Sequence, residues 1–163
     1  MREVKAECLA FIILFAGATA AMSASLTVAE LADLCMSPTM AEAVDKGRRL
    51  GWLRTGEARL EEWRRSFVAY NGSAVEVVGW QRGGQDEETL SFWIARGPNG
   101  HRACAYSAPN ATGLLEALSD RFGSPAQREK LDFGTSAFWR SGAEEIRFTA
   151  VGSRALINIS RGH

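Results

Sequence analysis

Residues 57–80, EARLEEWRRSFVAYNGSAVEVVGW, decide the fold, because the spacing of apolar residues changes within this stretch. In its first part, apolar side chains recur every three or four residues, which is the period of one helix face. These side chains are Leu60, Trp63, Phe67 and Tyr70. Asn71-Gly72 ends the helix, and residues 74–80 then alternate as in a strand. The stretch predicts a helix over 57–70, followed by a strand.

Two shorter helices are expected before this stretch. Residues 27–30, Thr-Val-Ala-Glu, have the spacing of a capping box, in which a hydroxyl and a carboxylate bind the free amides of a helix start. Ser37-Pro38 ends this helix and starts the next, because proline is tolerated in the first helical turn. The second helix ends before Gly51-Trp52.

Strands dominate the chain after residue 74. Two more strands are expected at 90–94 and around Cys104, joined by the tight turn Gly-Pro-Asn-Gly at 97–100. A helix over 112–122 follows, and Gly123 ends it. The last three strands are expected around residues 138–139, 146–150 and 155–159.

The predicted order is therefore α-α-α-β-β-β-α-β-β-β. Short turns within each group of three strands require antiparallel meanders. The fold class is α+β, with N-terminal helices and two antiparallel three-strand meanders separated by a helix, and with the helices on one side of the sheets. A single domain of this class is expected over residues 25–163.

Residues 1–20 have the features of a secretory signal peptide. Arg2 and Lys5 precede an uncharged apolar run at 9–16, and Ala18-Thr19-Ala20 offers a cleavage site. The small residues that follow also allow cleavage as late as residue 24. The alternative is a membrane anchor, but the strongly apolar part is shorter than the roughly 20 residues that a spanning helix needs. The signal predicts a periplasmic or extracellular protein with no stable membrane insertion after cleavage.

Lysine is scarce beside abundant alanine, which is typical of a GC-rich bacterial genome.

Cleavage of the signal removes Cys8 and leaves Cys35 and Cys104, which in an oxidising compartment form one disulfide. Such a bridge closes a loop of about 70 residues and is worth roughly 4 kcal/mol. The alternative is two separate thiols, one of them a nucleophile. His101 lies three residues before Cys104 and points to the opposite face of a strand, so it does not activate this thiol.

Composition argues against several classes of function. The chain has 19 Lys and Arg against 19 Asp and Glu, so no electrostatic attraction to nucleic acid is expected. It has two histidines, one of them C-terminal, so a zinc or copper site built from histidines is not expected. No metal and no cofactor are predicted. No Gly-x-Ser-x-Gly motif occurs, and a catalytic triad would have to use His101.

These observations favour binding over catalysis, with an unknown protein or a small ligand as the partner. A small cell-envelope hydrolase that uses His101 is the enzyme alternative, and a structural envelope component is the third. Residues 45–65 carry seven basic and four acidic residues. This cluster is interpreted as the polar faces of two helices, with an anion-binding patch as the alternative.

Trp80 and Trp93 are the predicted binding surface. If helices cover the strand face that carries Phe92, Trp93 points outward beside Trp80. An exposed aromatic patch of this kind marks a partner or ligand surface. The alternative is that a second layer covers this face as well.

A few short motifs resemble those of a group of uncharacterised small secreted or periplasmic alphaproteobacterial proteins. The motifs are Cys35, a helix ending in Gly51-Trp52, Arg102-Ala103-Cys104, and a helix end of the Leu-x-x-x-Phe-Gly type at residues 118–123. The resemblance covers about residues 31–123. It implies a Cys35–Cys104 bridge and a secreted domain, and it implies no catalytic residue.

Overall fold

The computed structural model describes residues 26–84, 87–98 and 100–162. The predicted signal peptide, residues 1–20 with cleavage as late as 24, lies outside the described residues. The helices are α1 (Val28–Cys35), α2 (Met40–Arg49), α3 (Glu57–Asn71) and α4 (Leu114–Phe122). Among the described residues, no helix is long and apolar enough to cross a membrane.

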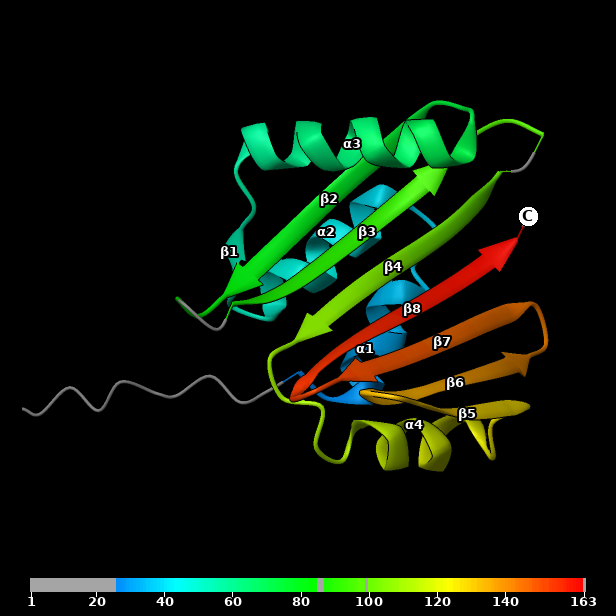
Figure 1. The fold of residues 1–163 in the computed structure, drawn as a ribbon. Coiled ribbons are helices and arrows are strands. Elements are labelled where there is room, and N and C mark those ends of the chain that lie inside the picture. Colours follow the sequence, from blue (N-terminus) through cyan, green and yellow to red (C-terminus); the bar gives the residue numbers. More distant parts are fainter. Residues whose placement is uncertain (1–25, 85–86, 99, 163) are drawn as a thin grey trace, which may run out of the picture.

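Eight strands of the described chain form one antiparallel sheet in the order β1-β2-β3-β4-β8-β7-β6-β5 (Figure 1). Their bounds are β1 (Leu53–Arg54), β2 (Val75–Arg82), β3 (Glu88–Ala95), β4 (His101–Ala108), β5 (Gln127–Leu131), β6 (Gly134–Ser141), β7 (Glu144–Val151) and β8 (Arg154–Gly162). The α+β class is confirmed. The two predicted meanders belong to one sheet, because β8 pairs with β4 and places Ile159 opposite Cys104.

The predicted order lacks two strands, β1 and β5, and is wrong to that extent. β1 has two residues, which is too short for an alternating pattern to be visible. β5, with the sequence QREKL, lies at the sheet edge and is exposed at every position, so apolar residues do not alternate along it. Its charged residues are typical of an edge strand that is protected from pairing with another chain.

Three helices, α1, α2 and α4, pack on one face of the sheet, which we call the core face. Figure 1 shows α1 and α2 behind the strands. The largest fully buried side chains of this core come from both helices and strands. They are Leu31, Leu34, Leu90, Phe92, Leu118, Trp139, Ile146, Ile157 and Ile159.

α3 lies on the other face, so the prediction that all helices share one side is wrong. The reason is that β2 and β3 are apolar on both faces. Val78 and Phe92 point into the core, whereas Val77 and Trp93 form a second buried cluster against Trp63 and Phe67 of α3. In Figure 1, α3 crosses in front of β2.

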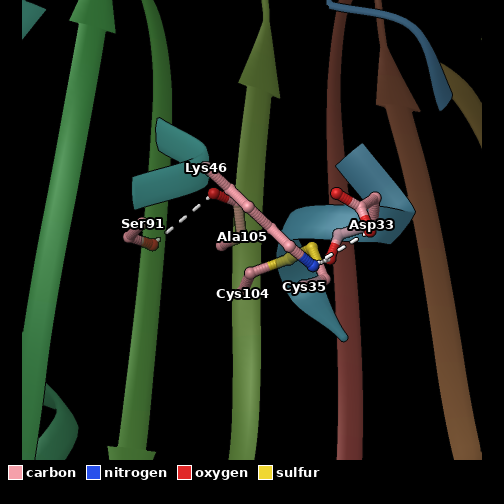
Figure 2. The surroundings of a disulfide bond; sticks show 6 residues. All are labelled: Asp33, Cys35, Lys46, Ser91, Cys104 and Ala105. Atoms are coloured by element: carbon pink, nitrogen blue, oxygen red, sulfur yellow. Dashed lines mark hydrogen bonds and ion pairs between the residues drawn. A yellow bond between two sulfur atoms is a disulfide. The ribbon is translucent and has the colours of Figure 1, made fainter. Parts of the chain in front are cut away.

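A disulfide ties α1 to the centre of the sheet. Cys35, the last residue of α1, is bonded to Cys104 of β4, with the two Cα atoms 5.3 Å apart. Lys46 of α2 extends across the disulfide and donates hydrogen bonds to the backbone oxygen and the carboxylate of Asp33, at 2.6 and 2.9 Å (Figure 2). The predicted bridge is confirmed. The predicted capping box at Thr27 also forms and begins α1.

Candidate functional site

The face of the sheet that carries α3 is only partly covered. α3 packs against β2, whereas none of the helices in the described part of the chain lies over β8, β7 and β6 on this side (Figure 1). A hollow of about 1290 Å³ lies at the step between α3 and these bare strands. Residues of α3, β3, β4, β7 and β8 line it, and we call it the hollow. Its volume is sufficient for a small-molecule ligand or a short peptide.

Aromatic side chains form one side of the hollow. The ring of Phe67 stacks on that of Trp93, with centroids 4.4 Å apart and planes inclined at 25°. The Trp93 indole donates a hydrogen bond to Nε2 of His101 at 3.4 Å. Tyr70 follows Phe67 by about one helical turn, and its side chain is 89% exposed. We call Phe67, Trp93 and Tyr70 the aromatic wall.

The floor of the hollow consists of small and polar residues on two paired strands. Ala103 of β4 lies opposite Ser160 of β8, and His101 lies opposite Gly162. Asn158 lies two residues before Ser160, on the same face of β8, and both are half-buried. Because the side chains of Ala103 and Ser160 are small, a ligand can approach the sheet backbone between the aromatic wall and β7.

Charged residues of β7 form the far side. Glu145 and Arg147 point into the hollow because the alternating residues Ile146 and Phe148 point into the core. Glu145 accepts a hydrogen bond from Arg140 of β6 at 2.6 Å. The Arg147 guanidinium lies 3.9 Å from Glu145, which is too far for a hydrogen bond.

Trp80 and Trp93, the predicted binding surface, lie on opposite faces of the sheet and are 2% and 9% exposed. The expected exposed patch therefore does not form, because α2 covers Trp80 and α3 covers Trp93. The alternative prediction, that a second layer covers the Trp93 face, agrees with this arrangement. Trp93 nevertheless lines the hollow, whereas Trp80 does not.

His101, the predicted residue of the hydrolase alternative, also lines the hollow, together with Ser160 and Glu145. A serine nucleophile requires a histidine nitrogen that accepts its proton and a carboxylate that orients the imidazole. Here Nε2 of His101 accepts from the Trp93 indole, and Glu145 is bonded to Arg140. The His101 imidazole and the Glu145 carboxylate are therefore bonded to Trp93 and Arg140. Within the described residues, no cluster of three or more His, Cys, Asp or Glu side chains could hold a metal ion.

A buried polar cluster lies elsewhere, on the core face. Tyr106 donates a hydrogen bond to Glu88 at 2.8 Å, and Arg82 donates to the same carboxylate at 2.6 Å. Burial, together with the hydrogen bond to Glu88, raises the pKa of Tyr106 well above its usual range. The Arg82 guanidinium also lies 5.0 Å from the centre of the Trp52 ring, so the charged groups of this cluster have partners within the protein.

Several basic residues of the 45–65 cluster have acidic partners. Lys46 pairs with Asp33 at 2.9 Å, and Arg59 pairs with Glu87 at 2.9 Å. Arg64 forms a hydrogen bond with Glu61. These pairs support the interpretation of the cluster as solvated helix faces rather than an anion-binding patch.

Sequence reasoning missed most residues of the hollow. Tyr70 was expected on the apolar face of its helix, but its side chain is exposed and lines the hollow. Arg147, Asn158 and Ser160 occupy the outward positions of strands whose inward positions were recognised. Their alternation with Ile146 and Ile157 indicated an exposed face, but nothing in the sequence showed that α3 lies beside it.

Comparison of the chain with protein-family models, with curated proteins and with solved structures gave no match. The short motifs around Cys35 and Cys104 therefore remain a resemblance, and no family is assigned.

Proposed function

We propose that this protein is an exported, non-catalytic binding domain of the bacterial cell envelope or periplasm, and that it binds a small ligand or a partner protein in the hollow. The observation that carries the proposal is the composition of the hollow. It combines an aromatic wall, a floor of small polar residues and a charged far side. Concave sites with aromatic and a few polar groups are typical of ligand binding.

Export is supported by two independent features. The Cys35–Cys104 disulfide is of a kind that persists in oxidising compartments and is rare in the cytosol. The first 20 residues have the charge distribution and cleavage motif of a secretory signal. Together they favour a periplasmic or extracellular location.

Site-specific photocross-linking tests the binding role. A photoreactive amino acid replaces Tyr70, which lines the hollow, or Glu62, an exposed residue of α3 outside it. Both variants are expressed with the leader in the bacterium that carries the gene, and adducts are identified by mass. We expect an adduct at position 70 that is absent at position 62. Equal adducts at both positions, or none at position 70, would contradict the proposal.

The hydrolase and the structural component remain the alternatives, and each has its own test. If His101 were the base of a hydrolytic reaction, His101→Ala would abolish that activity. A hydrolytic activity that this variant loses while it remains folded would show that the protein is an enzyme rather than a binding domain. A structural component would form a stable oligomer, and its mass in light scattering would not change when residues of the hollow are substituted. We expect neither result.

A further inference from the structure

We propose that the ligand of the hollow is a carboxylate that carries an aromatic ring, with the ring against the aromatic wall and the carboxylate on Arg147. The inference rests on the proposed function and deepens it by naming the chemical class of the ligand. Two sources share this chemistry, a free aromatic acid and the C-terminal end of a peptide with an aromatic residue nearby.

The aromatic wall favours a ring. The Phe67 and Trp93 rings are already stacked, and Trp93 is held by its hydrogen bond to His101, so their orientation is fixed before a ligand binds. Tyr70 presents a further ring to solvent at the rim. Stacked aromatic rings attract one another beyond the burial of their apolar area, so a ligand ring is favoured here.

The charges of the hollow favour an anion. Arg147 and Glu145 line the hollow, and the Glu145 carboxylate is already bound by Arg140, which lies outside it. Among the described residues, the Arg147 guanidinium makes no hydrogen bond, and its contact with Glu145 is 3.9 Å long. The guanidinium lies 5.1 Å from the Phe138 ring, which supports its position over the sheet. Its planar set of donors matches a carboxylate.

The span between these two groups fits a molecule of modest size. Trp93, Ala103, Ser160 and Glu145 lie in one row across β3, β4, β8 and β7. Three strand spacings correspond to about 14 Å between the Cα atoms of Trp93 and Glu145. Arg147 lies two residues from Glu145 on the same face of β7, opposite Asn158, so its Cα atom is farther from Trp93. The long Trp93 and Arg147 side chains shorten the distance between them from both ends, which leaves room for a ring and a short chain. Asn158 and Ser160 offer hydrogen bonds between them.

Binding of defined probes tests the inference by NMR titration of the oxidised, leader-free protein. The free-acid probe is 4-phenylbutyrate, with 4-phenylbutanol as its neutral analogue and butyrate as its analogue without a ring. The peptide probe is acetyl-Phe-Gly-Gly, with the C-terminal amide as its neutral analogue. We expect the acids with a ring to shift the Trp93 indole N–H and the Arg147 Nε–H resonances, and the tighter of the two acids identifies the source.

Arg147→Gln separates the carboxylate contact from the ring contact. We expect this variant to bind the acids at least about tenfold more weakly, because a charge-assisted pair is lost, and to bind 4-phenylbutanol unchanged. Arg154→Gln is the matched control, since Arg154 is an exposed arginine on the same face of β8 that does not line the hollow. It should bind all probes as the unmodified protein does.

Three results would overturn the inference. They are equal binding of the acids and their neutral analogues, binding of butyrate as tight as that of 4-phenylbutyrate, and no shift with any probe at millimolar concentration. Each of these leaves the binding role standing if the cross-link at position 70 is specific. Failure of the cross-linking comparison removes the binding role itself, so the two failures are distinguishable.

Discussion

Single glycines determine how closely the helices approach the sheet. Gly47 of α2 lies directly against the Trp80 ring, and Gly79 of β2 lies against the Trp63 ring of α3. A Cβ atom at either position would overlap the facing indole. The two tryptophans are therefore accommodated by the absence of a side chain opposite them, once on each face of the sheet.

Gly47→Ala tests this contact, because two effects predict opposite signs. Helix propensity alone predicts a gain of about 1 kcal/mol in the free energy of unfolding. Overlap with the buried Trp80 ring predicts a loss of about 1–3 kcal/mol. We expect a net loss in urea denaturation. Gly84→Ala, at a position with open space around it, is the control and should change little. A stabilised Gly47→Ala variant would show that the Trp80 contact is loose.

The burial of Tyr106, together with its hydrogen bond to Glu88, predicts that the free energy of unfolding depends on pH. The pKa of Tyr106 is raised in the folded state, so the unfolded chain loses this proton first, near the usual pKa of about 10. The contribution of protonated Tyr106 to the free energy of unfolding is therefore fully present below about pH 10 and is lost as the pH rises above that value.

Tyr106→Phe should lower the free energy of unfolding by about 1–3 kcal/mol at neutral pH, because Glu88 loses a buried donor. The difference between the two proteins should shrink above pH 10 or so. Urea denaturation at a series of pH values measures it. Tyr70→Phe, at the exposed tyrosine, should show no difference at any pH. A difference for Tyr106→Phe that stays constant into alkaline solution would contradict the assigned pKa shift.

At the scale of elements, the disulfide holds α1 in place, which is the shortest of the helices in the described residues. α1 has 8 residues, and isolated helices of this length are not stable in water. Its buried face and its bond to β4 supply the stability that its length does not.

The double variant Cys35→Ala, Cys104→Ala should unfold with a free energy lower by roughly 4 kcal/mol, the chain-entropy estimate for a loop of about 70 residues. Unmodified protein in reductant should lose a similar amount. Amide exchange in α1 should accelerate in both. A loss below about 1 kcal/mol would mean that packing alone positions α1.

Elements with a clear apolar period were predictable from the sequence, and elements without one were not. The stripe of α3 and its end at Gly72, in the left-handed conformation, were visible in the residues themselves. β1 pairs through backbone groups of Leu53 and Arg54 whose side chains are exposed, so it left no pattern. β5 is exposed along its whole length for the same reason.

At the scale of the whole molecule, the arrangement of the elements was less predictable than the elements. Both three-strand groups were expected, but their union through β4 and β8 depends on contacts between residues about 55 positions apart, such as Cys104 and Ile159. The hollow is a consequence of this union. The pairing of β4 with β8 makes one sheet of eight strands among the described residues, which is too wide for α3 alone to cover. The hollow forms where the cover of α3 ends.

The intact mass of the protein, purified from the bacterium that carries the gene, tests the central claim of an exported, disulfide-bonded domain most directly. We expect a chain that begins between residues 21 and 25, lacks two hydrogens relative to its reduced mass, and takes up no alkylating reagent before reduction. A retained leader, or alkylation of both Cys35 and Cys104 without reduction, would contradict the account.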